Sequence, residues 1–275
     1  MPVAAPDFDF LRRLVYERSA IVLEPGKEYL VEARLIPLAK QAGFANLEAM
    51  LGTMRAQPAN GLHQRVVEAM TTNETSWYRD AAPFDALRLK VLPELIARPE
   101  SERQLRIWSM AASSGQEIYS IAMLLKEHFP ALGGWRVHLL ATDLSRDVLA
   151  KAREGRYNQL EVNRGLPAPL LIKYFEKNGL DWQLKAALRQ TVEFREMNLA
   201  TSWPALPPMD LIFLRNVLIY FDVETKRQIL ERVRRVLKPH GHLFLGGAET
   251  TFQIDDRFER VSIGKATAYR LRAGG

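Results

Sequence analysis

Two apolar segments, each followed by small or acidic residues, constrain the fold of this chain most strongly. The first, Leu105 to Met110, is followed by small residues and Gly115, and a helical pattern begins directly after that glycine. The second, 136–141, leads to Asp143, and the interval from Gly115 holds a turn, a helix and a strand. This pattern predicts a doubly wound parallel sheet with a nucleoside site, in which Asp143 accepts hydrogen bonds from ribose hydroxyls.

Strand-like and helical segments alternate from Leu105 to the end of the chain, which predicts a parallel sheet covered on both faces. We predict strands over 105–110, 136–141, 191–196, 209–214, 242–247, 257–262 and 266–271. We predict helices over 116–129, 145–154, 168–176 and 223–237. The last two strands follow each other without a helix, so we expect an antiparallel edge.

No strand-like alternation precedes residue 105, and we predict that residues 1–80 form a small N-terminal helical domain. Apolar residues at helical spacing predict helices around 8–15, 27–41, 47–54 and 62–70. Gly43 should end the second helix, and Pro37 should kink or break it. Pro93 should likewise interrupt the helical segment 84–95.

The remaining chain, 81–275, is predicted to form the α/β domain with a small insertion. Within this domain, the segment from about 174 to 198 contains the turn signal Asn178-Gly179 followed by short alternating pieces. We predict a hairpin or a three-stranded flap outside the main sheet there.

Composition excludes several classes of site and partner. The 275 residues include no cysteine, so disulfides, thiolate metal sites and cysteine nucleophiles are excluded. The five histidines lack metal-binding spacing, and we assign no metal. The N-terminal residues do not resemble a signal peptide, and no apolar run approaches the ~20 residues of a membrane span. We therefore expect a cytoplasmic protein without membrane insertion.

The net charge of +6 does not indicate a nucleic-acid partner. Residues 1–80 hold nine Lys and Arg and ten Asp and Glu, and the chain contains no run of like charges. A basic stripe with interleaved aromatic residues, the usual footprint of nucleic-acid binding, is missing.

The residues around Gly115 indicate which nucleoside binds. The segment has one glycine rather than the G-x-G-x-x-G pattern of dinucleotide sites, and Glu117 should lie near the helix N-terminus. A carboxylate there disfavours a pyrophosphate and suits a cationic ligand. The sulfonium and ammonium groups of S-adenosylmethionine (SAM) meet this requirement better than NAD.

Four segments in order resemble one family, the bacterial chemotaxis receptor methyltransferases (CheR family). They are Thr72–Arg79, Ala111–Ala122, Ala141–Asp143 and Arg215–Asp222. Together they span nearly the whole chain. The resemblance implies an enzyme that transfers a methyl group from SAM to glutamate side chains on the cytoplasmic helical bundle of a chemoreceptor, leaving S-adenosylhomocysteine (SAH) and tuning chemosensory signalling.

The resemblance also implies the site residues. It implies catalytic roles for Arg79, which would face the incoming carboxylate, and for Tyr220, which would line the acceptor site. Contacts to SAM are implied for Asn73, Thr75, Arg79, Ser113, Gly115, Glu117, Asp143, Asn198, Leu199, Arg215 and Asn216. Asn198 and Leu199 would flank the adenine. Gln116 and Ile118 depart from the acidic-acidic-proline motif of the family, but the glutamate that binds SAM in the family, here Glu117, is present.

Two other functions stay open from the sequence alone. One is a SAM-binding adaptor without catalysis, and the other is a methyltransferase with a different acceptor. The segment RNVLIYF, however, lacks the (N/D)PP(Y/F) motif common in base methyltransferases.

The resemblance implies that an N-terminal helix, here KEYLVEARLIPLAKQAG, docks on the receptor bundle. It carries Lys27, Arg34 and Lys40 but also Glu28 and Glu32, so it is less basic than usual. Some family members also bind a C-terminal receptor peptide through the flap. The segment 174–198 is compact here, so we expect no dependence on such a peptide. We expect the protein to be a monomer.

Overall fold

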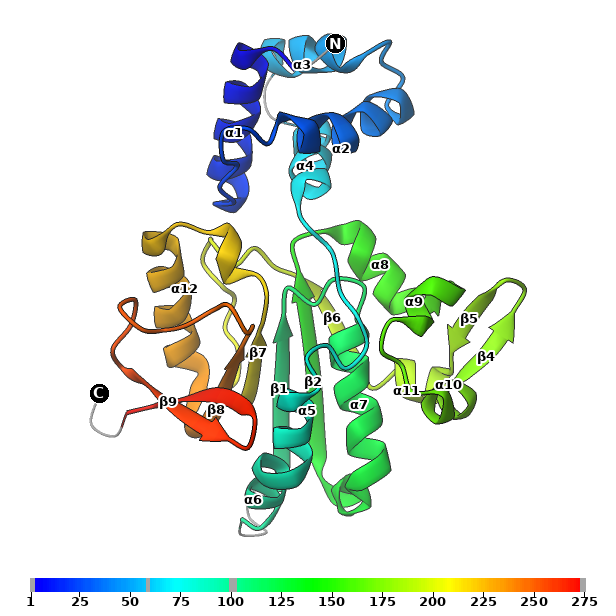
Figure 1. The fold of residues 1–275 in the computed structure, drawn as a ribbon, viewed down its shortest axis with the longest axis vertical. Helices are drawn as coiled ribbons and strands as arrows, with labels where there is room; N and C mark the ends of the chain where they lie inside the picture. Colours follow the sequence, from blue (N-terminus) through cyan, green and yellow to red (C-terminus); the bar gives the residue numbers. More distant parts are fainter. Residues whose placement is uncertain (1–2, 58–59, 99–102, 273–275) are drawn as a thin grey trace.

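An N-terminal group of four helices stands apart from a larger α/β body in the computed structural model, which describes residues 3–57, 60–98 and 103–272 (Figure 1). The four helices are α1 (Ala5–Ser19), α2 (Glu28–Gln41), α3 (Leu47–Ala56) and α4 (Gly61–Met70). Their apolar stripes bury a separate core that includes Leu11, Leu35 and Met50. Asn46 caps α3 and Asn60 caps α4 by accepting from backbone N–H groups, as expected for Asn at that position. The four predicted helices are therefore confirmed.

Pro37 does not break its helix, and the segment around Pro93 stays helical but changes its helix type. α2 continues through Pro37 to Gln41, and Gly43, with φ of 82°, follows its end as predicted. The second segment comprises α5 (Ala82–Ala86), a π-helical turn η1 (Leu87–Val91) and α6 (Leu92–Ile96). Its π-helical spacing, in which Leu92 N–H donates to the Leu87 carbonyl, comes directly before Pro93. Widening the turn accommodates a proline ring that would clash with an α-helical carbonyl.

The α/β body is built on a seven-stranded sheet with the order β6-β2-β1-β7-β8-β10-β9. The first five strands in that order are parallel, and β10 pairs antiparallel with β8 and with β9, so the predicted antiparallel edge is confirmed. The strands are β1 (Gln104–Met110), β2 (Arg136–Asp143), β6 (Val192–Glu196), β7 (Met209–Leu214), β8 (Leu237–Leu245), β9 (Phe258–Ile263) and β10 (Ala266–Leu271). Only β8 differs clearly from its prediction, because it begins five residues before the expected start at 242.

Helices cover both faces of the sheet, and each face has its own core. The helices of this part are α7 (Gln116–His128), α8 (Arg146–Glu154) and α12 (Val223–Val236), with short 3-10 turns η3 (Pro130–Gly134) and η4 (Leu218–Tyr220). Along β1, Ile107 packs into the core beneath α7, while Trp108 packs into the core beneath α12. Successive residues of a buried strand thus serve opposite cores, as the pleat requires.

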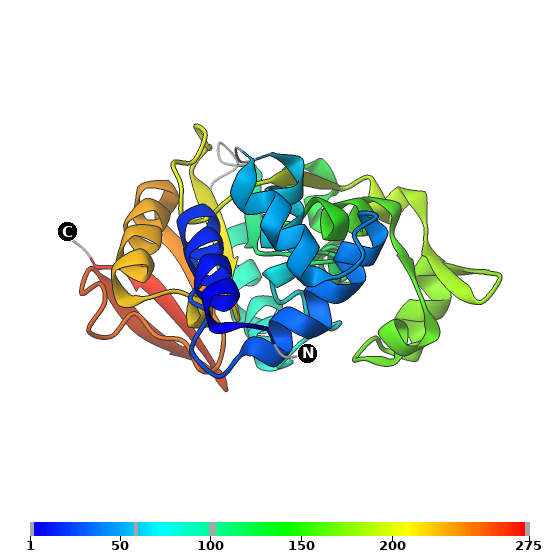
Figure 2. The ribbon, with the colours of Figure 1, turned by 90° about the horizontal axis from the view of Figure 1, so that it is seen from above.

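The predicted flap exists, but one of its strands comes from outside the predicted range. β4 (Phe175–Asn178) and β5 (Asp181–Leu184) form the hairpin around Gly179, and the third strand is β3 (Arg156–Tyr157). The short helices α9 (Gln159–Asn163), α10 (Ala168–Tyr174) and α11 (Ala186–Arg189) accompany it. This β-subdomain projects from one side of the body (Figure 2). The end of the predicted range, 192–196, belongs to the main sheet as β6.

A linker over residues 71–80 joins the helical group to the sheet, and both of its ends are held. Arg34 on α2 donates to the carbonyls of Met70 and Thr71 and to Thr72 Oγ1. At the other end, Trp77 is buried and its ring meets Tyr157 edge-to-face at 5.0 Å. The linker is therefore a fixed part of the structure rather than a flexible tether.

Gly165 makes a close approach to this linker that only glycine permits. Its φ is 95°, and a Cβ built there would lie 2.2 Å from the carbonyl oxygen of Trp77. Gly165→Ala should therefore lower the free energy of unfolding by about 3 kcal/mol or more.

Gly179→Ala is the matched control, because Gly179 has a φ of 61° but no atom within 4 Å of the added carbon. We expect it to cost only the conformational strain, about 1 kcal/mol. Urea unfolding of both variants measures the difference. Equal losses would show that the approach to Trp77 does not constrain the linker.

Candidate functional site

A cavity lies at the carboxyl ends of the central strands, between the sheet and the helical group. Its walls come from the end of α1, the linker and the segments that follow β1, β2, β6 and β7. The lining residues are Ser19, Ile21, Thr71, Thr72, Asn73, Glu74, Thr75, Arg79, Ala111, Ala112, Ser113, Glu117, Asp143, Leu144, Met197, Asn198, Leu199, Arg215, Asn216, Val217, Tyr220 and Phe221.

The cavity brings together every residue singled out from the sequence except Gly115. Gly115 precedes α7 with a φ of 92°, and a Cβ there would lie 3.1 Å from both Ala152 and Tyr119. The structure therefore gives Gly115 a role in a tight turn and in close helix packing, and its predicted contact with SAM stays a prediction.

The turn after β1 is fixed by hydrogen bonds to β2 on one side and to the linker on the other. Ala111 and Ser113 adopt left-handed φ values of 51°, and Ala112 N–H donates to the Thr142 carbonyl. Ser113 Oγ donates to the Asn73 carbonyl of the linker at 2.6 Å. The first turn of the sheet and the linker thus form one continuous wall.

Asp143 sits at the end of β2 and ties that turn to the next loop. Its two oxygens accept from Ser113 N–H at 2.8 Å and from Ser145 N–H at 2.9 Å. Burial raises the pKa of Asp143, and the N–H groups of Ser145, Ser113 and Leu144 oppose that shift by stabilising the charged form. A carboxylate offers about four acceptor positions, so at least one is left for a ligand hydroxyl.

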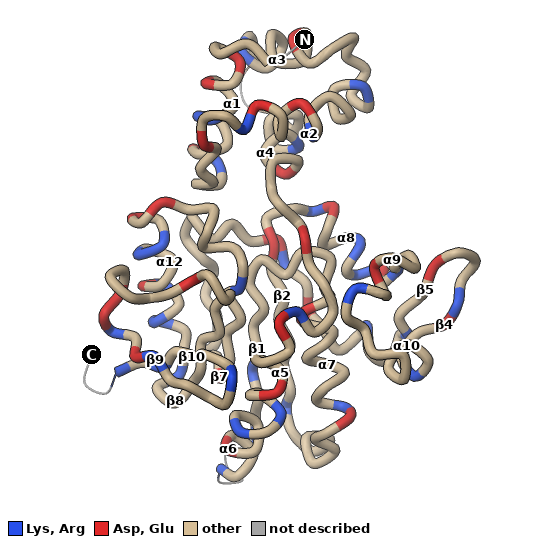
Figure 3. Tube along the Cα trace, in the orientation of Figure 1, with Lys and Arg blue, Asp and Glu red and all other residues tan. Residues whose placement is uncertain are grey.

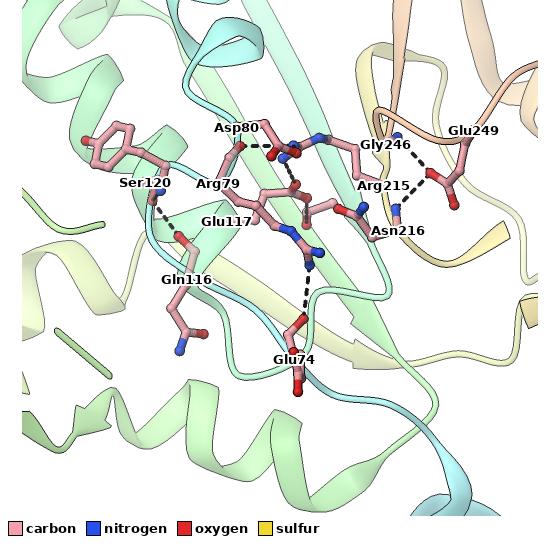
Figure 4. Close-up of polar contacts among 12 residues, drawn as sticks. Glu74, Arg79, Asp80, Gln116, Glu117, Ser120, Arg215, Asn216, Gly246 and Glu249 are labelled. Atoms are coloured by element: carbon pink, nitrogen blue, oxygen red, sulfur yellow. Dashed lines mark hydrogen bonds and ion pairs between the residues drawn. The ribbon is translucent and has the colours of Figure 1, made fainter. Parts of the chain in front are cut away.

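Arg215, at the end of β7, holds three parts of the site together (Figure 4). Its side chain is only 2% exposed, and it donates to Glu117 Oε2 at 2.9 Å, Asp80 Oδ2 at 2.7 Å and the Arg79 carbonyl at 2.9 Å. Glu117, in the first turn of α7, also accepts from Ser109 Oγ at 2.8 Å. These contacts join a strand end, a helix start and the linker.

This group of three charged side chains keeps an excess of one negative charge. Two carboxylates, Glu117 and Asp80, share the single guanidinium of Arg215. Glu74 and Asp143 add carboxylates to the cavity wall, and Arg79 adds a cation. The cavity is therefore suited to a ligand that carries positive charge, as the position of Glu117 predicted.

Glu249, which the sequence did not single out, organises the loop that carries Asn216 and Tyr220. Its carboxylate accepts from the N–H groups of Asn216 and Val217 at 2.8 Å each and from Gly246 at 2.7 Å. It lies after β8, far from the loop in sequence, and no local pattern links the two.

The helical group closes the cavity through contacts that sequence reasoning also missed. Val22 N–H donates to the Tyr220 carbonyl at 2.9 Å, and Ile21 forms an isolated β-bridge with Phe221. Asn198 Nδ2 donates to the Arg18 carbonyl at 2.6 Å, and its Oδ1 accepts from Ala200 N–H. The amide expected to read a base thus already binds the end of α1, which leaves only part of its capacity for a ligand.

Two predicted catalytic side chains, Arg79 and Tyr220, have polar groups left free. Within the described residues Arg79 makes one hydrogen bond, from Nη1 to the Glu74 carbonyl at 3.3 Å, and no ion pair. Over the same residues the Tyr220 hydroxyl has no hydrogen-bond partner, although the ring lines the cavity. Both groups can therefore receive a polar ligand without breaking an existing contact.

The described residues contain neither a candidate metal cluster nor a membrane-spanning helix. In that part of the chain, no three His, Asp or Glu side chains gather so that they could hold a metal ion. Over the same residues no helix has the length and apolar character needed to cross a bilayer.

Comparison with known proteins agrees with this geometry. Residues 73–267 match the family model described as CheR methyltransferase, SAM binding domain, and residues 6–71 match the CheR methyltransferase all-alpha domain. A chemotaxis protein methyltransferase 1 of Pseudomonas aeruginosa is 43% identical over 99% of this chain and 100% of its own length. Chemotaxis protein methyltransferase Cher2 of Pseudomonas putida is 41% identical over 97% of this chain and 98% of its own.

The Arg215 contacts yield a stability prediction. Arg215→Met should leave the nearly buried Glu117 carboxylate without its cation and lower the free energy of unfolding by about 3 kcal/mol. Arg227→Met on α12 is the control, because Arg227 and its partner Glu224 are both exposed and such a pair contributes less than about 1 kcal/mol. Urea unfolding of both variants tests this. Similar small losses would contradict the structural role given to Arg215.

Proposed function

The chain belongs to the CheR methyltransferase family, SAM-dependent enzymes of chemotaxis, and from that premise we propose that it methylates glutamate side chains on the cytoplasmic helices of a chemoreceptor. The observation that carries this proposal is the cavity at the strand ends, whose carboxylates outnumber its guanidinium groups. Such a site favours a sulfonium donor over an anionic cofactor.

The residues of the cavity fit SAM. Asp143 keeps acceptor capacity for a ribose hydroxyl, and the buried side chains of Met197 and Leu199 offer apolar contact for a base. Glu117 would attract the ammonium group of the methionine part. Arg215 Nε is buried without a partner among the described residues, and the carboxylate of the methionine part would supply one. When bound, SAM supplies an activated methyl group on a positively charged sulfur.

The chain's own contribution to the reaction is alignment rather than proton transfer. A glutamate with a pKa near ~4.3 is already ionised at neutral pH, so the acceptor needs no general base. Methyl transfer to it requires an in-line approach to within about 3–3.5 Å. The walls of the cavity hold the donor, and the acceptor must be held in a fixed orientation with most of its water removed.

Arg79 and Tyr220 are suited to hold the acceptor carboxylate. Arg79 has no carboxylate partner in the described part of the chain, whereas Arg215 already has two. Arg79 would orient the carboxylate through the oxygen that does not react, and the Tyr220 hydroxyl would donate to the same oxygen. A guanidinium paired too tightly with the acceptor would reduce the nucleophilicity of the acceptor carboxylate. We therefore propose that Arg79 makes a single orienting contact with it.

Receptor docking would use the outer face of the helical group. On α2, Arg34 is engaged with the linker and Glu32 accepts from Val3 N–H, so neither is free to meet a receptor. Lys27 and Lys40 remain as the basic residues of that helix. Charged residues of both signs occur along α1 and α2 (Figure 3).

Transfer of radiolabelled methyl groups from SAM to a receptor cytoplasmic fragment tests the proposed function. Base-labile label on the fragment, as expected for a glutamyl ester, supports it. SAM binding without transfer would identify an adaptor, and label on nucleic acid or a small molecule would identify another acceptor. Either result would overturn the proposal.

Tyr220→Phe separates catalysis from donor binding. Removing the hydroxyl takes away one hydrogen bond to the acceptor, so kcat should fall at least about tenfold while the affinity for SAH changes less than about twofold. Steady-state kinetics and calorimetry measure the two quantities. Equal losses in both would contradict the role given to Tyr220.

A titration tests independence from a receptor tether. We propose that methylation does not require a C-terminal receptor peptide bound to the β-subdomain. A synthetic peptide copying the receptor C-terminus should therefore show no binding at micromolar concentrations by fluorescence anisotropy, and a receptor fragment without that peptide should be methylated equally well. Micromolar affinity together with slower methylation of the shortened fragment would refute this.

A further inference from the structure

The loop after β7 carries two groups of the proposed site, and three of its backbone N–H groups have no backbone partner among the described residues. Asn216 adopts a left-handed φ of 59°, which is unfavourable for a residue with a side chain. The N–H groups of Asn216, Val217 and Ile219 find no partner in a helix or strand. Something outside the loop must therefore satisfy them.

Glu249 supplies that partner. Its Oε2 accepts from Asn216 N–H at 2.8 Å and from Gly246 N–H at 2.7 Å, and its Oε1 accepts from Val217 N–H at 2.8 Å and from Ile219 N–H at 3.3 Å. Figure 4 shows the carboxylate between Asn216 and Gly246. Hydrogen bonds to a charged acceptor are about twice as strong as neutral ones, so one side chain fixes two loop segments.

The approach of these segments also depends on Gly246. A Cβ at that position would lie 2.7 Å from Asn216 Nδ2 and 2.7 Å from Glu249 Oε2. Real Cβ atoms do not approach other atoms so closely, so a side chain here would push the loop away from β8. The glycine and the carboxylate act together to set the position of Asn216.

The Glu249 carboxylate has no acceptor position left for a ligand. A carboxylate offers about four acceptor positions, and four backbone N–H groups already occupy them. Its side chain is also absent from the lining of the cavity, to which Asn216 and Tyr220 contribute. Its influence on the site therefore passes through the loop.

We infer that Glu249 is a positioning residue that places Asn216 for donor binding and Tyr220 for the acceptor. The inference rests on the proposed function for the second role only, because donor binding can be measured without turnover. A purely structural residue would change stability alone, whereas a positioning residue changes ligand affinity in a way that depends on Asn216.

SAH binding to Glu249→Gln tests the inference. The amide keeps the shape but lacks a second acceptor oxygen and places an NH₂ group against backbone donors, so SAH affinity should fall about tenfold. In an Asn216→Ala background the same substitution should cost less than about twofold, because the contact it positions is already gone. Calorimetric titrations of the four proteins give the coupling.

Asp255→Asn is the matched control, since Asp255 is another carboxylate of the segment after β8, with a nearly buried side chain. It pairs with Arg234 on α12 at 2.7 Å and has no contact with the loop. We expect this substitution to lower the melting temperature without weakening the binding of SAH. Melting curves of all variants identify any that is unfolded, and Glu249→Asp, which keeps the charge, replaces Glu249→Gln in that case with the same expected coupling.

Three results would overturn the inference: unchanged SAH affinity in Glu249→Gln, additive losses with Asn216→Ala, or an equal loss in Asp255→Asn. These outcomes are separate from failure of the proposed function, in which the wild type binds SAH but methylates no receptor fragment. In that case the calorimetric coupling still decides the role of Glu249.

Discussion

The site depends on one buried guanidinium. Arg215 lies at the end of β7 and reaches Glu117 on α7 as well as Asp80 and the Arg79 carbonyl on the linker. Isolated buried charges are costly, and this arrangement is stable only because each charge has a partner. The same contacts fix where the linker crosses the sheet, and therefore where Asn73, Thr75 and Arg79 stand in the cavity wall.

The two arginines of the cavity wall differ in burial and in their partners. Arg215 is buried and paired with two carboxylates, so it holds the site together and its positive charge is more than neutralised. Arg79 is half-buried with a single hydrogen bond to a carbonyl in the described part of the chain, so its fork can still receive an acceptor. The excess of carboxylates suits a cationic donor, while the free guanidinium suits an anionic acceptor, and methyl transfer to glutamate needs both.

The sheet and its helices could be predicted from the sequence because buried parallel strands are continuous apolar runs and the helices carry apolar residues at helical spacing. β1, β7 and α12 were found within a few residues for this reason. Pro37 does not break α2, and the helical segment around Pro93 continues through a π-helical turn, so the tertiary structure tolerates both prolines within helical segments. Local pattern also pointed to the turn after β1, to Glu117 and to Asp143, since strand ends of a parallel sheet meet at one edge, whereas the other site residues were implied by the family resemblance.

Contacts between distant segments could not be predicted. Glu249 binds the backbone of a loop about thirty residues away, and Arg18 and Val22 of the helical group close the cavity. β3 lies outside the range predicted for the flap, yet it pairs with the hairpin of β4 and β5. Gly115 shows the same limit, since its role in packing against Ala152 depends on a helix that only the tertiary structure brings near. Such pairings carry no periodicity and leave no local signal.

The central claim is that a negatively charged cavity between the helical group and the sheet binds the methyl donor through Glu117. Calorimetric titration of the full chain with SAH, which keeps the ammonium group that Glu117 would attract, tests it most directly when wild type and Glu117→Gln are compared. The account predicts one SAH bound per wild-type chain and at least about tenfold weaker binding in the variant. No heat from folded wild type, or equal affinity in the two proteins, would contradict it.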